Sequence, residues 1–254
     1  MHPILISLGP IHLYSYGLLV AVGVLCAVML LRKNAKIISI NPDLIVDLAI
    51  VVVLSGFTGA RIFYIAQFWE YFRSSPLDML KIWEGGIILY GGVIGGLIGF
   101  FVFTRIKRLS FLSTLDLFVP AIALAQGFGR IGCFLNGCCF GKATHWPWAV
   151  SFPFLDHPVH PTQLYESIFD FCLAALLLFL FHRRLKTGTV AAVYFVLYPA
   201  ARFFLEFVRG DNQAIFLNLT LHQWISLVFI VVTLSLFFWN RLTRHGNEAA
   251  HRSA

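Results

Sequence analysis

Residues 13–31 read LYSYGLLVAVGVLCAVMLL, a stretch of apolar and small polar residues without a single charged side chain. A helix needs about 20 such residues to cross the hydrocarbon core of a bilayer. Arg32, Lys33 and Lys36 follow the stretch, and no lysine or arginine precedes it. This order is typical of a membrane-spanning helix that is retained, because a cleaved signal peptide carries its basic residues first.

Six further apolar runs follow the first one along the chain. Of the 254 residues, 59% are hydrophobic and 12% are charged, and the mean hydropathy is +0.80. An ordinary soluble domain carries about 25% charged residues, so this composition excludes a soluble enzyme. We predict an all-α fold, a single integral membrane domain over residues 1–254 with seven transmembrane helices. The predicted spans are 13–31, 44–66, 87–104, 112–132, 163–181, 188–208 and 221–240.

Basic residues are distributed unequally among the connections between these runs. They follow the first, third, fifth and seventh runs, whereas the connections 67–86 and 133–162 carry mixed or few charges. By the positive-inside rule, the N-terminus lies on the periplasmic (external) side and the C-terminus in the cytoplasm. The net charge of +7 therefore reflects membrane orientation, and no nucleic acid partner is expected.

Several charged residues lie inside the apolar runs or at their ends. An arginine near the bilayer centre costs about 2.5 to 3.5 kcal/mol on insertion scales, so such residues face a cavity or a partner. A structural ion pair or a side chain extended to the interface is the alternative for each of them. They are Arg61, Asp116, Arg130, Glu166, Arg202, Glu206 and Arg209.

The sixth run places four polar side chains on one face. Tyr198, Arg202, Glu206 and Arg209 follow one another at steps of four, four and three residues, which makes them neighbours on a helix. One arginine can be held by Glu206 while another remains free for an anion. A guanidinium group donates two parallel hydrogen bonds to phosphate, so this face is a candidate phosphate-binding surface.

Glycines are concentrated in two other runs. Residues 126–141 read QGFGRIGCFLNGCCFG and contain the GxGxxG pattern of dinucleotide sites, which we reject because no strand precedes it. A lipid headgroup site against Arg130 and Asn136 and a glycine-rich packing segment with a re-entrant turn both remain open. In the third run, glycines from 91 to 99 recur at four-residue spacing, which predicts close helix packing after Tyr90.

Five groups of residues, taken together, resemble the prolipoprotein diacylglyceryl transferase family. The resemblance extends from the first span to the end of the seventh, and the order and spacing of the motifs make it specific. The groups are Tyr16-Gly17, the glycine repeat after Tyr90, Asp116 with Gly129-Arg-Ile-Gly-Cys-Phe-Leu-Asn-Gly137, His160-Pro-Thr-Gln-Leu-Tyr-Glu166, and the series from Tyr198 to Arg209.

The resemblance implies a multi-pass enzyme of the bacterial inner (cytoplasmic) membrane. Such an enzyme moves the diacylglyceryl group of phosphatidylglycerol to the lipobox cysteine of a preprolipoprotein signal peptide, which forms a thioether and releases glycerol 1-phosphate. The expected partners are phosphatidylglycerol, the signal peptide and membrane lipids. No cofactor is expected, because the nucleophilic thiol belongs to the substrate.

The resemblance also implies roles for individual side chains. Arg130 and Arg202 neutralise the phosphate as it leaves, where positive charge is most effective, and Tyr90 is the third catalytic candidate. The implied substrate-binding residues are Tyr16, Arg61, Asn136, Tyr198, Glu206 and Arg209. The implied supporting residues are Asp116, His160, Gln163, Tyr165 and Glu166.

Tyr90 departs from the family pattern, in which a histidine precedes the Gly-Gly of the third helix. A phenol with a pKa of about 10 is a poor base at neutral pH, so the proton acceptor stays open. Two alternatives to the transferase follow: a diverged paralogue that acts on another thiol or lipid acceptor, and a non-catalytic lipid-binding or transport protein. The sequence has no internal repeat of the kind that transporters show.

Cys133, Cys138 and Cys139 are a second departure, on the side predicted to face the oxidising compartment. A disulfide, a metal site that includes external histidines, and inert thiols all remain open. The spacing matches no strong zinc signature, so the predicted site contains no metal.

Overall fold

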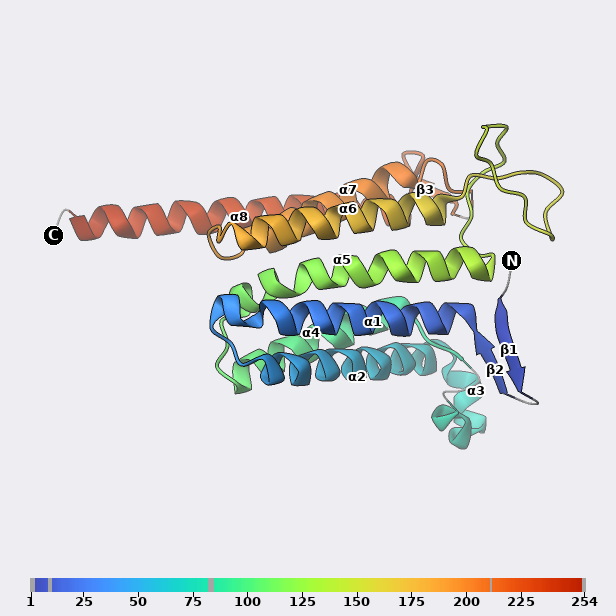
Figure 1. Ribbon diagram of the computed structural model, residues 1–254, viewed down its shortest axis with the longest axis horizontal. Helices are drawn as coiled ribbons and strands as arrows, with labels where there is room; N and C mark the ends of the chain where they lie inside the picture. Colours follow the sequence, from blue (N-terminus) through green and yellow to red (C-terminus); the bar gives the residue numbers. More distant parts are fainter. Residues whose placement is uncertain (1–2, 9–10, 82–84, 211, 253–254) are drawn as a thin grey trace. The chain divides into compact units, whose positions relative to one another are not determined.

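A computed structural model describes residues 3–8, 11–81, 85–210 and 212–252, and within these ranges the chain is mostly helical (Figure 1). Each predicted span coincides with one helix, which confirms the prediction of a helical polytopic protein. These helices are α1 (Ser15–Asn34), α2 (Pro42–Gln67), α4 (Leu89–Ile106), α5 (Phe111–Asn136), α6 (Thr162–His182), α7 (Thr189–Leu205) and α8 (Leu221–Arg252).

Within the described residues, five of these helices are long and apolar enough to cross a membrane: α1, α2, α4, α5 and α6. The chain is therefore a multi-pass membrane protein. Helix α7 has 17 residues, about 26 Å at 1.5 Å per residue, against a hydrocarbon thickness of about 30 Å. It ends earlier than the predicted run 188–208 because Phe207 and Val208 donate backbone hydrogen bonds to carbonyls three residues back. The apolar part of α8, Leu221–Phe237, is also shorter than the other five.

Short elements that the apolar pattern does not predict occupy the connections. Strands β1 (Ile4–Leu8) and β2 (Ile11–Tyr14) form an antiparallel hairpin, and β3 (Ala214–Phe216) pairs antiparallel with β4 (Leu219–Thr220). The remaining short helices are η1 (Ala35–Ile38), α3 (Trp69–Ser74) and η2 (Pro76–Leu80).

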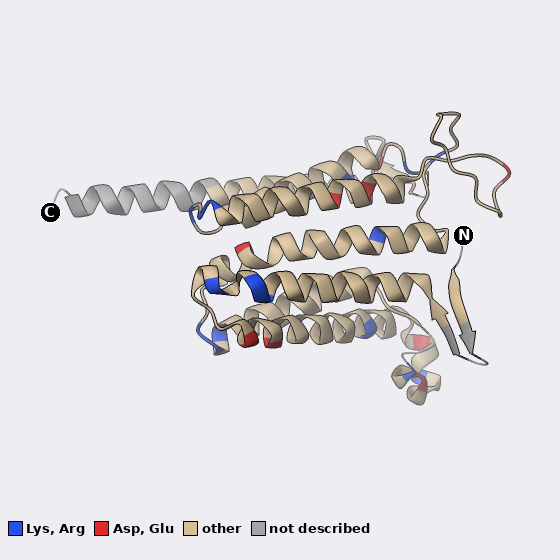
Figure 2. Cartoon of the chain, in the orientation of Figure 1, with Lys and Arg blue, Asp and Glu red and all other residues tan. Residues whose placement is uncertain are grey.

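The chain divides into two compact units, one made of Leu31–Thr114 and the other of Met1–Leu30 with Leu115–Ala254. Charged side chains are sparse along the helices, and many of them lie near helix ends (Figure 2). This distribution fits helices that cross a bilayer, because the ends of such helices meet water and headgroups.

Helices α2 and α4 form the first unit through direct backbone contact. A Cβ atom on Gly59 would lie 2.3 Å from the carbonyl oxygen of Gly91, and one on Gly95 would lie 2.3 Å from that of Ser55. Small residues allow such close approach between membrane helices. The packing predicted from the glycine repeat is therefore confirmed, and its partner is α2.

Arg61 on α2 holds the connection that precedes α4. Its three guanidinium nitrogens donate hydrogen bonds at 2.7–3.2 Å to the backbone carbonyls of Asp78, Met79, Lys81, Gly85 and Gly86. This arrangement satisfies carbonyls that the irregular segment leaves without helical partners. These contacts are structural, and the assignment of Arg61 to substrate binding in the sequence analysis stays a prediction.

The second unit is built on α5, α6, α7 and α8. Ser167 of α6 donates a hydrogen bond of 2.9 Å to the carbonyl of Gly127 in α5. Asp116, near the other end of α5, accepts hydrogen bonds from the backbone N–H groups of Gly188 (2.6 Å) and Ala191 (2.7 Å). A carboxylate in this position caps the start of α7 and interacts favourably with the helix dipole.

The contact between α2 and α4 predicts opposite outcomes for two neighbouring glycines. Gly95→Ala should destabilise the protein by about 1 to 3 kcal/mol, the usual cost of overpacking, because the new Cβ meets the Ser55 carbonyl at 2.3 Å. Gly92→Ala is the matched control, since its Cβ would lie 3.6 Å from Ala60. Thermal unfolding of both purified variants measures the difference; equal stability would contradict the backbone contact.

Candidate active site

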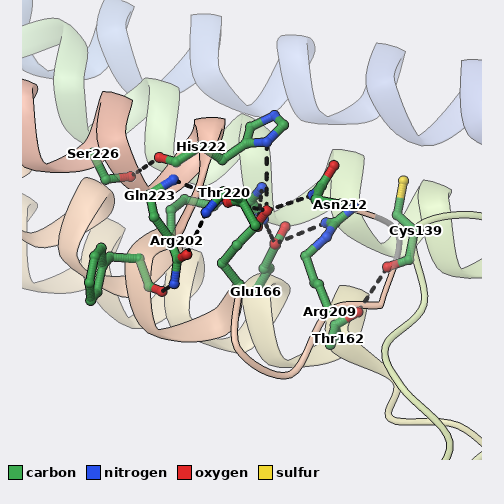
Figure 3. A network of polar contacts seen from close by, with 12 residues as sticks. Cys139, Thr162, Glu166, Arg202, Arg209, Asn212, Thr220, His222, Gln223 and Ser226 are labelled. Carbon is green, nitrogen blue, oxygen red and sulfur yellow. Dashed lines mark hydrogen bonds and ion pairs between the residues drawn. The ribbon is translucent and has the colours of Figure 1, made fainter. Parts of the chain in front are cut away.

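Glu166 of α6 is the centre of a buried ion cluster in the second unit. Its carboxylate forms ion pairs with Arg202 of α7 and with Arg209, which follows α7; the distance to Arg209 is 3.4 Å (Figure 3). It also forms an ion pair with Arg130 of α5. The Glu166 side chain is 4% exposed. A buried carboxylate is stable when cations and hydrogen bonds surround it, and here three guanidinium groups do so.

Glu206 is a second buried carboxylate, and it belongs to the same cluster through Arg202. Arg202 Nη2 lies 3.4 Å from Glu206 Oε2, while Glu206 Oε1 accepts hydrogen bonds from Asn212 (2.6 Å) and Thr220 (2.9 Å). His222 Nδ1 lies 3.6 Å from the same oxygen. These partners come from the segment that leads into α8, so Glu206 joins the end of α7 to the start of α8 (Figure 3).

The start of α8 is fixed by a capping box. The N–H of Thr220 donates to Gln223 Oε1 (2.9 Å), and the N–H of Gln223 donates to Thr220 Oγ1 (3.4 Å). This reciprocal pair satisfies two backbone donors at the helix start. Gln223 also donates to the carbonyl of Phe203 in α7 at 3.3 Å. The sequence Thr-Leu-His-Gln carries this signal, which the sequence analysis missed.

The arginines of the cluster differ in how much of their hydrogen-bonding capacity the protein uses. Arg202 is held by both carboxylates through its two terminal nitrogens. Arg130 is held by Glu166 through Nε, and within the described residues neither of its terminal nitrogens has a hydrogen-bond partner. The fork of Arg130, with its side chain 22% exposed, therefore remains available for a phosphate-like anion.

Asp170 is a third acidic residue of this region, and the sequence analysis does not include it. It lies one helical turn after Glu166 on α6 and is 1% exposed. Neither of its carboxylate oxygens has a hydrogen-bond partner among the described residues. Arg130 and Arg202 interact with it electrostatically. Burial of a carboxylate without a hydrogen-bond partner lowers the stability of the folded protein. Asp170 is therefore a candidate for a functional role.

Two tyrosines that the sequence analysis assigns to substrate binding interact electrostatically with Arg130. Tyr198 stacks on Tyr194, with ring centroids 5.6 Å apart and an interplanar angle of 11°. Tyr16 of α1 lies against Gly132, one of the α5 glycines, and is 45% exposed. A phenol hydroxyl can donate a hydrogen bond to a headgroup, so both tyrosines stay candidates for substrate binding.

The turn after α5 is held against the first turn of α6 and the end of α7. Gly141 donates its N–H to the carbonyl of His160 (2.8 Å), and Lys142 donates to that of Val208 (2.8 Å). The Tyr165 hydroxyl lies 3.2 Å from His160 Nδ1 and accepts a hydrogen bond of 2.7 Å from Trp148. His160 and Tyr165 therefore support the loop that brings Arg209 to Glu166. Gln163, 1% exposed, supports the same turn through the carbonyl of Cys138 (2.5 Å).

Asp116, Asn136 and Tyr90 are the other residues that the sequence analysis assigns to the site. Asp116 caps the far end of α7, about 21 Å along α5 from Arg130 at 1.5 Å per residue. Asn136 is exposed at the end of α5, and the described residues show no hydrogen bond between it and Arg130. Tyr90, 44% exposed, lies in the first turn of α4 and belongs to the other unit.

The chain is similar to proteins of one known family. The family model for prolipoprotein diacylglyceryl transferase matches residues 3–239. A protein of Clostridium tetani named phosphatidylglycerol–prolipoprotein diacylglyceryl transferase is 40% identical over 249 residues, which are 96% of this chain and 100% of that protein. Proteins of the same name from Trichormus variabilis (38% identical, covering 93% of this chain and 89% of theirs) and Finegoldia magna (35%, covering 91% and 92%) are also similar. The chain belongs to the prolipoprotein diacylglyceryl transferase family.

Proposed function

We propose that the cluster around Glu166 is the active site at which this chain transfers the diacylglyceryl group of phosphatidylglycerol to prolipoproteins. The protein is a transferase of lipoprotein biosynthesis, and the acceptor in our proposal is the lipobox cysteine of the signal peptide. The observation that carries the assignment is the fork of Arg130. Its Nε forms an ion pair with Glu166, and among the described residues its two terminal nitrogens have no hydrogen-bond partner, so they can take the lipid phosphate.

The reaction requires positive charge at one defined position. The acceptor sulfur forms a bond to the glycerol carbon of the diacylglyceryl group, the bond from that carbon to the phosphate oxygen breaks, and glycerol 1-phosphate leaves with the electron pair. Negative charge therefore grows on the phosphate, where preorganised donors are most effective. Arg130 and Arg202 supply these donors, and the same positive charge favours the thiolate form of the acceptor.

The acceptor thiol must also lose its proton. Tyr90 does not remove the proton in this proposal, because a phenol is a poor base at neutral pH. Asp170 is the better acceptor, because its carboxylate is buried beside Arg130 and Arg202 and has no hydrogen-bond partner among the described residues. Tyr16, Tyr198 and Arg209 complete the headgroup site, and Glu206 keeps Arg202 in place.

The same proposal places the protein in the inner membrane as one domain with seven spans. The five long helices support this arrangement together with the two shorter apolar helices α7 and α8. The basic connections after the first, third, fifth and seventh spans support a cytoplasmic C-terminus and an ion cluster on the external side of the membrane.

The phosphate assignment is tested with purified protein, phosphatidylglycerol and a peptide that contains a lipobox cysteine. Transfer raises the peptide mass by one diacylglyceryl group. Arg130→Gln should lower kcat by about 10²- to 10³-fold, as loss of one oxyanion donor does, and Arg130→Lys should give an intermediate loss because lysine lacks the fork. Arg183→Gln, at the cytoplasmic end of α6 where its guanidinium stacks on Phe179, is the control and should keep full activity. Unchanged turnover in Arg130→Gln would remove the basis of the proposal.

The proton-acceptor role is tested by the pH dependence of Asp170→Asn. This variant should lose about 10²-fold in kcat near pH 6.5, within the range that general bases contribute. The loss should shrink as the pH approaches about 8.5, where a free thiol ionises without help. Asp170→Glu should recover part of the activity. An equal loss at every pH would assign Asp170 to structure instead.

The orientation is tested with a protease-sensitive tag fused after residue 254. Protease added to inside-out membrane vesicles should remove the tag, whereas protease added to intact spheroplasts should leave it in place, because the positive-inside rule puts the C-terminus in the cytoplasm. A tag that is cleaved in spheroplasts would mean an even number of spans or an inverted topology.

A further inference from the structure

Three cysteines next to the ion cluster remain unused by the proposed reaction. The sulfur atoms of Cys133, Cys138 and Cys139 all lie within 4.8 Å of one another, and those of Cys138 and Cys139 are 3.6 Å apart. Each of the three side chains is partly buried. The backbone around these residues explains why three thiol groups lie so close together.

The end of α5 brings the first two cysteines together. Gly137 has a φ of 74°, the N–H of Cys138 donates to the carbonyl of Cys133 (3.2 Å), and the N–H of Gly137 donates to that of Phe134 (3.1 Å). This pair of hydrogen bonds around a left-handed glycine is the Schellman motif, which places the side chains of Cys133 and Cys138 in contact.

Cys139 reaches the other two cysteines through a strained backbone conformation. Cys139 has a φ of 64°, a left-handed conformation that residues with a Cβ rarely adopt and that persists where the surroundings enforce it. Here the first turn of α6 enforces it, because Thr162 donates to the carbonyl of Cys139 (2.8 Å) and Gln163 donates to that of Cys138 (2.5 Å). Strain held in this way points to a function of the turn.

A guanidinium group lies near the sulfur cluster, because Arg209 interacts electrostatically with Cys139. Arg209 is also an ion-pair partner of Glu166, so it lies between the sulfur cluster and the proposed active site. Thiolates are the form in which cysteines bind metals.

The sulfur spacing is compatible with a metal site: the three cysteines are free, and the sulfurs of Cys139 and Cys138 lie at hydrogen-bond distance. Thiolates around one zinc ion, each about 2.3 Å from it, lie about 3.7 to 4 Å from one another in trigonal or tetrahedral geometry. A disulfide requires about 2.05 Å and joins two sulfurs, which would leave the third unused. The observed separation of 3.6 Å between Cys138 and Cys139 is close to the first value.

We propose that Cys133, Cys138 and Cys139 bind one thiophilic metal ion of the class of Zn²⁺ or Cu⁺. Three thiolates select such soft or borderline ions over Mg²⁺ or Ca²⁺. The ion fixes the turn whose next residues, Gly141 and Lys142, pair with Arg209 and Val208. The site is structural, and it stands apart from the proposed transferase chemistry.

Metal binding is tested directly, with Cd²⁺ as the probe and full-length protein in detergent. A Cys26→Ser/Cys172→Ser variant leaves the three cluster thiols as the remaining cysteines. This variant, reduced and freed of metal, should bind one Cd²⁺ per chain with the near-ultraviolet absorption of cadmium thiolates, and Zn²⁺ should displace that ion. Serine at any one of the three positions should weaken binding by more than about tenfold, since loss of even an outer-shell partner costs a metal site 10- to 100-fold.

A second measurement does not depend on the folding of the serine variants. Bound Cd²⁺ should protect all three thiols of the reduced protein from alkylation, which peptide mass mapping detects. No stoichiometric binding, or unchanged binding after replacement of all three cysteines by serine, would overturn the proposal. A disulfide between two of them in protein alkylated directly in isolated membranes would also overturn it. Each readout is independent of transfer activity, so failure of this inference and failure of the proposed function are distinguishable.

Discussion

The ion pairs of Glu166 are the interaction on which the second unit depends. One carboxylate on α6 contacts guanidinium groups from α5, from α7 and from the segment after α7. Inside a membrane protein, removal of one partner from a buried ion pair leaves an uncompensated charge and costs about 3 to 5 kcal/mol. The ion pairs therefore hold the three segments together, because separating them would leave unpaired charges in an apolar environment. The same charged residues form the candidate active site.

Arg202 and Arg130 differ in the number of glutamates that hold them. Arg202 pairs with Glu166 and Glu206, and Arg130 pairs with Glu166. Glu206 has a fully buried side chain and pairs with Arg202 at Nη2, while Glu166 pairs with Arg202 at Nη1. Arg130 forms an ion pair with Glu166 at Nε, and among the described residues its terminal nitrogens have no hydrogen-bond partner, so they are the donors that our proposal assigns to a ligand. A site built in this way binds an anion without reorganisation, and preorganisation of this kind is what makes electrostatic catalysis effective.

The helices could be predicted from the sequence, and the pairings between them could not. Each apolar run predicts a helix because about 20 apolar residues have one stable arrangement in a bilayer. The spacing from Arg202 to Glu206 predicts their ion pair, since it is local. The role of Glu166 depends on residues 36 and 43 positions away, a separation that helical periodicity does not encode. Asp116 shows the same limit, because a charge within an apolar run predicts a partner but does not say that the partner is the start of another helix.

The two units solve the problem of membrane helix association by different physical means. In the first unit α2 and α4 approach until backbone meets backbone, and glycine is required at the closest positions, Gly59, Gly91 and Gly95, where a Cβ would overlap the facing helix. In the second unit the helices are joined by side chains that carry charge. Close glycine contacts have one favourable arrangement and little capacity to respond to a ligand. A charged cluster can gain further interactions when an anion arrives. The apolar helix pair therefore suits a scaffold, and the residues of the proposed active site are concentrated where charge already holds the helices together.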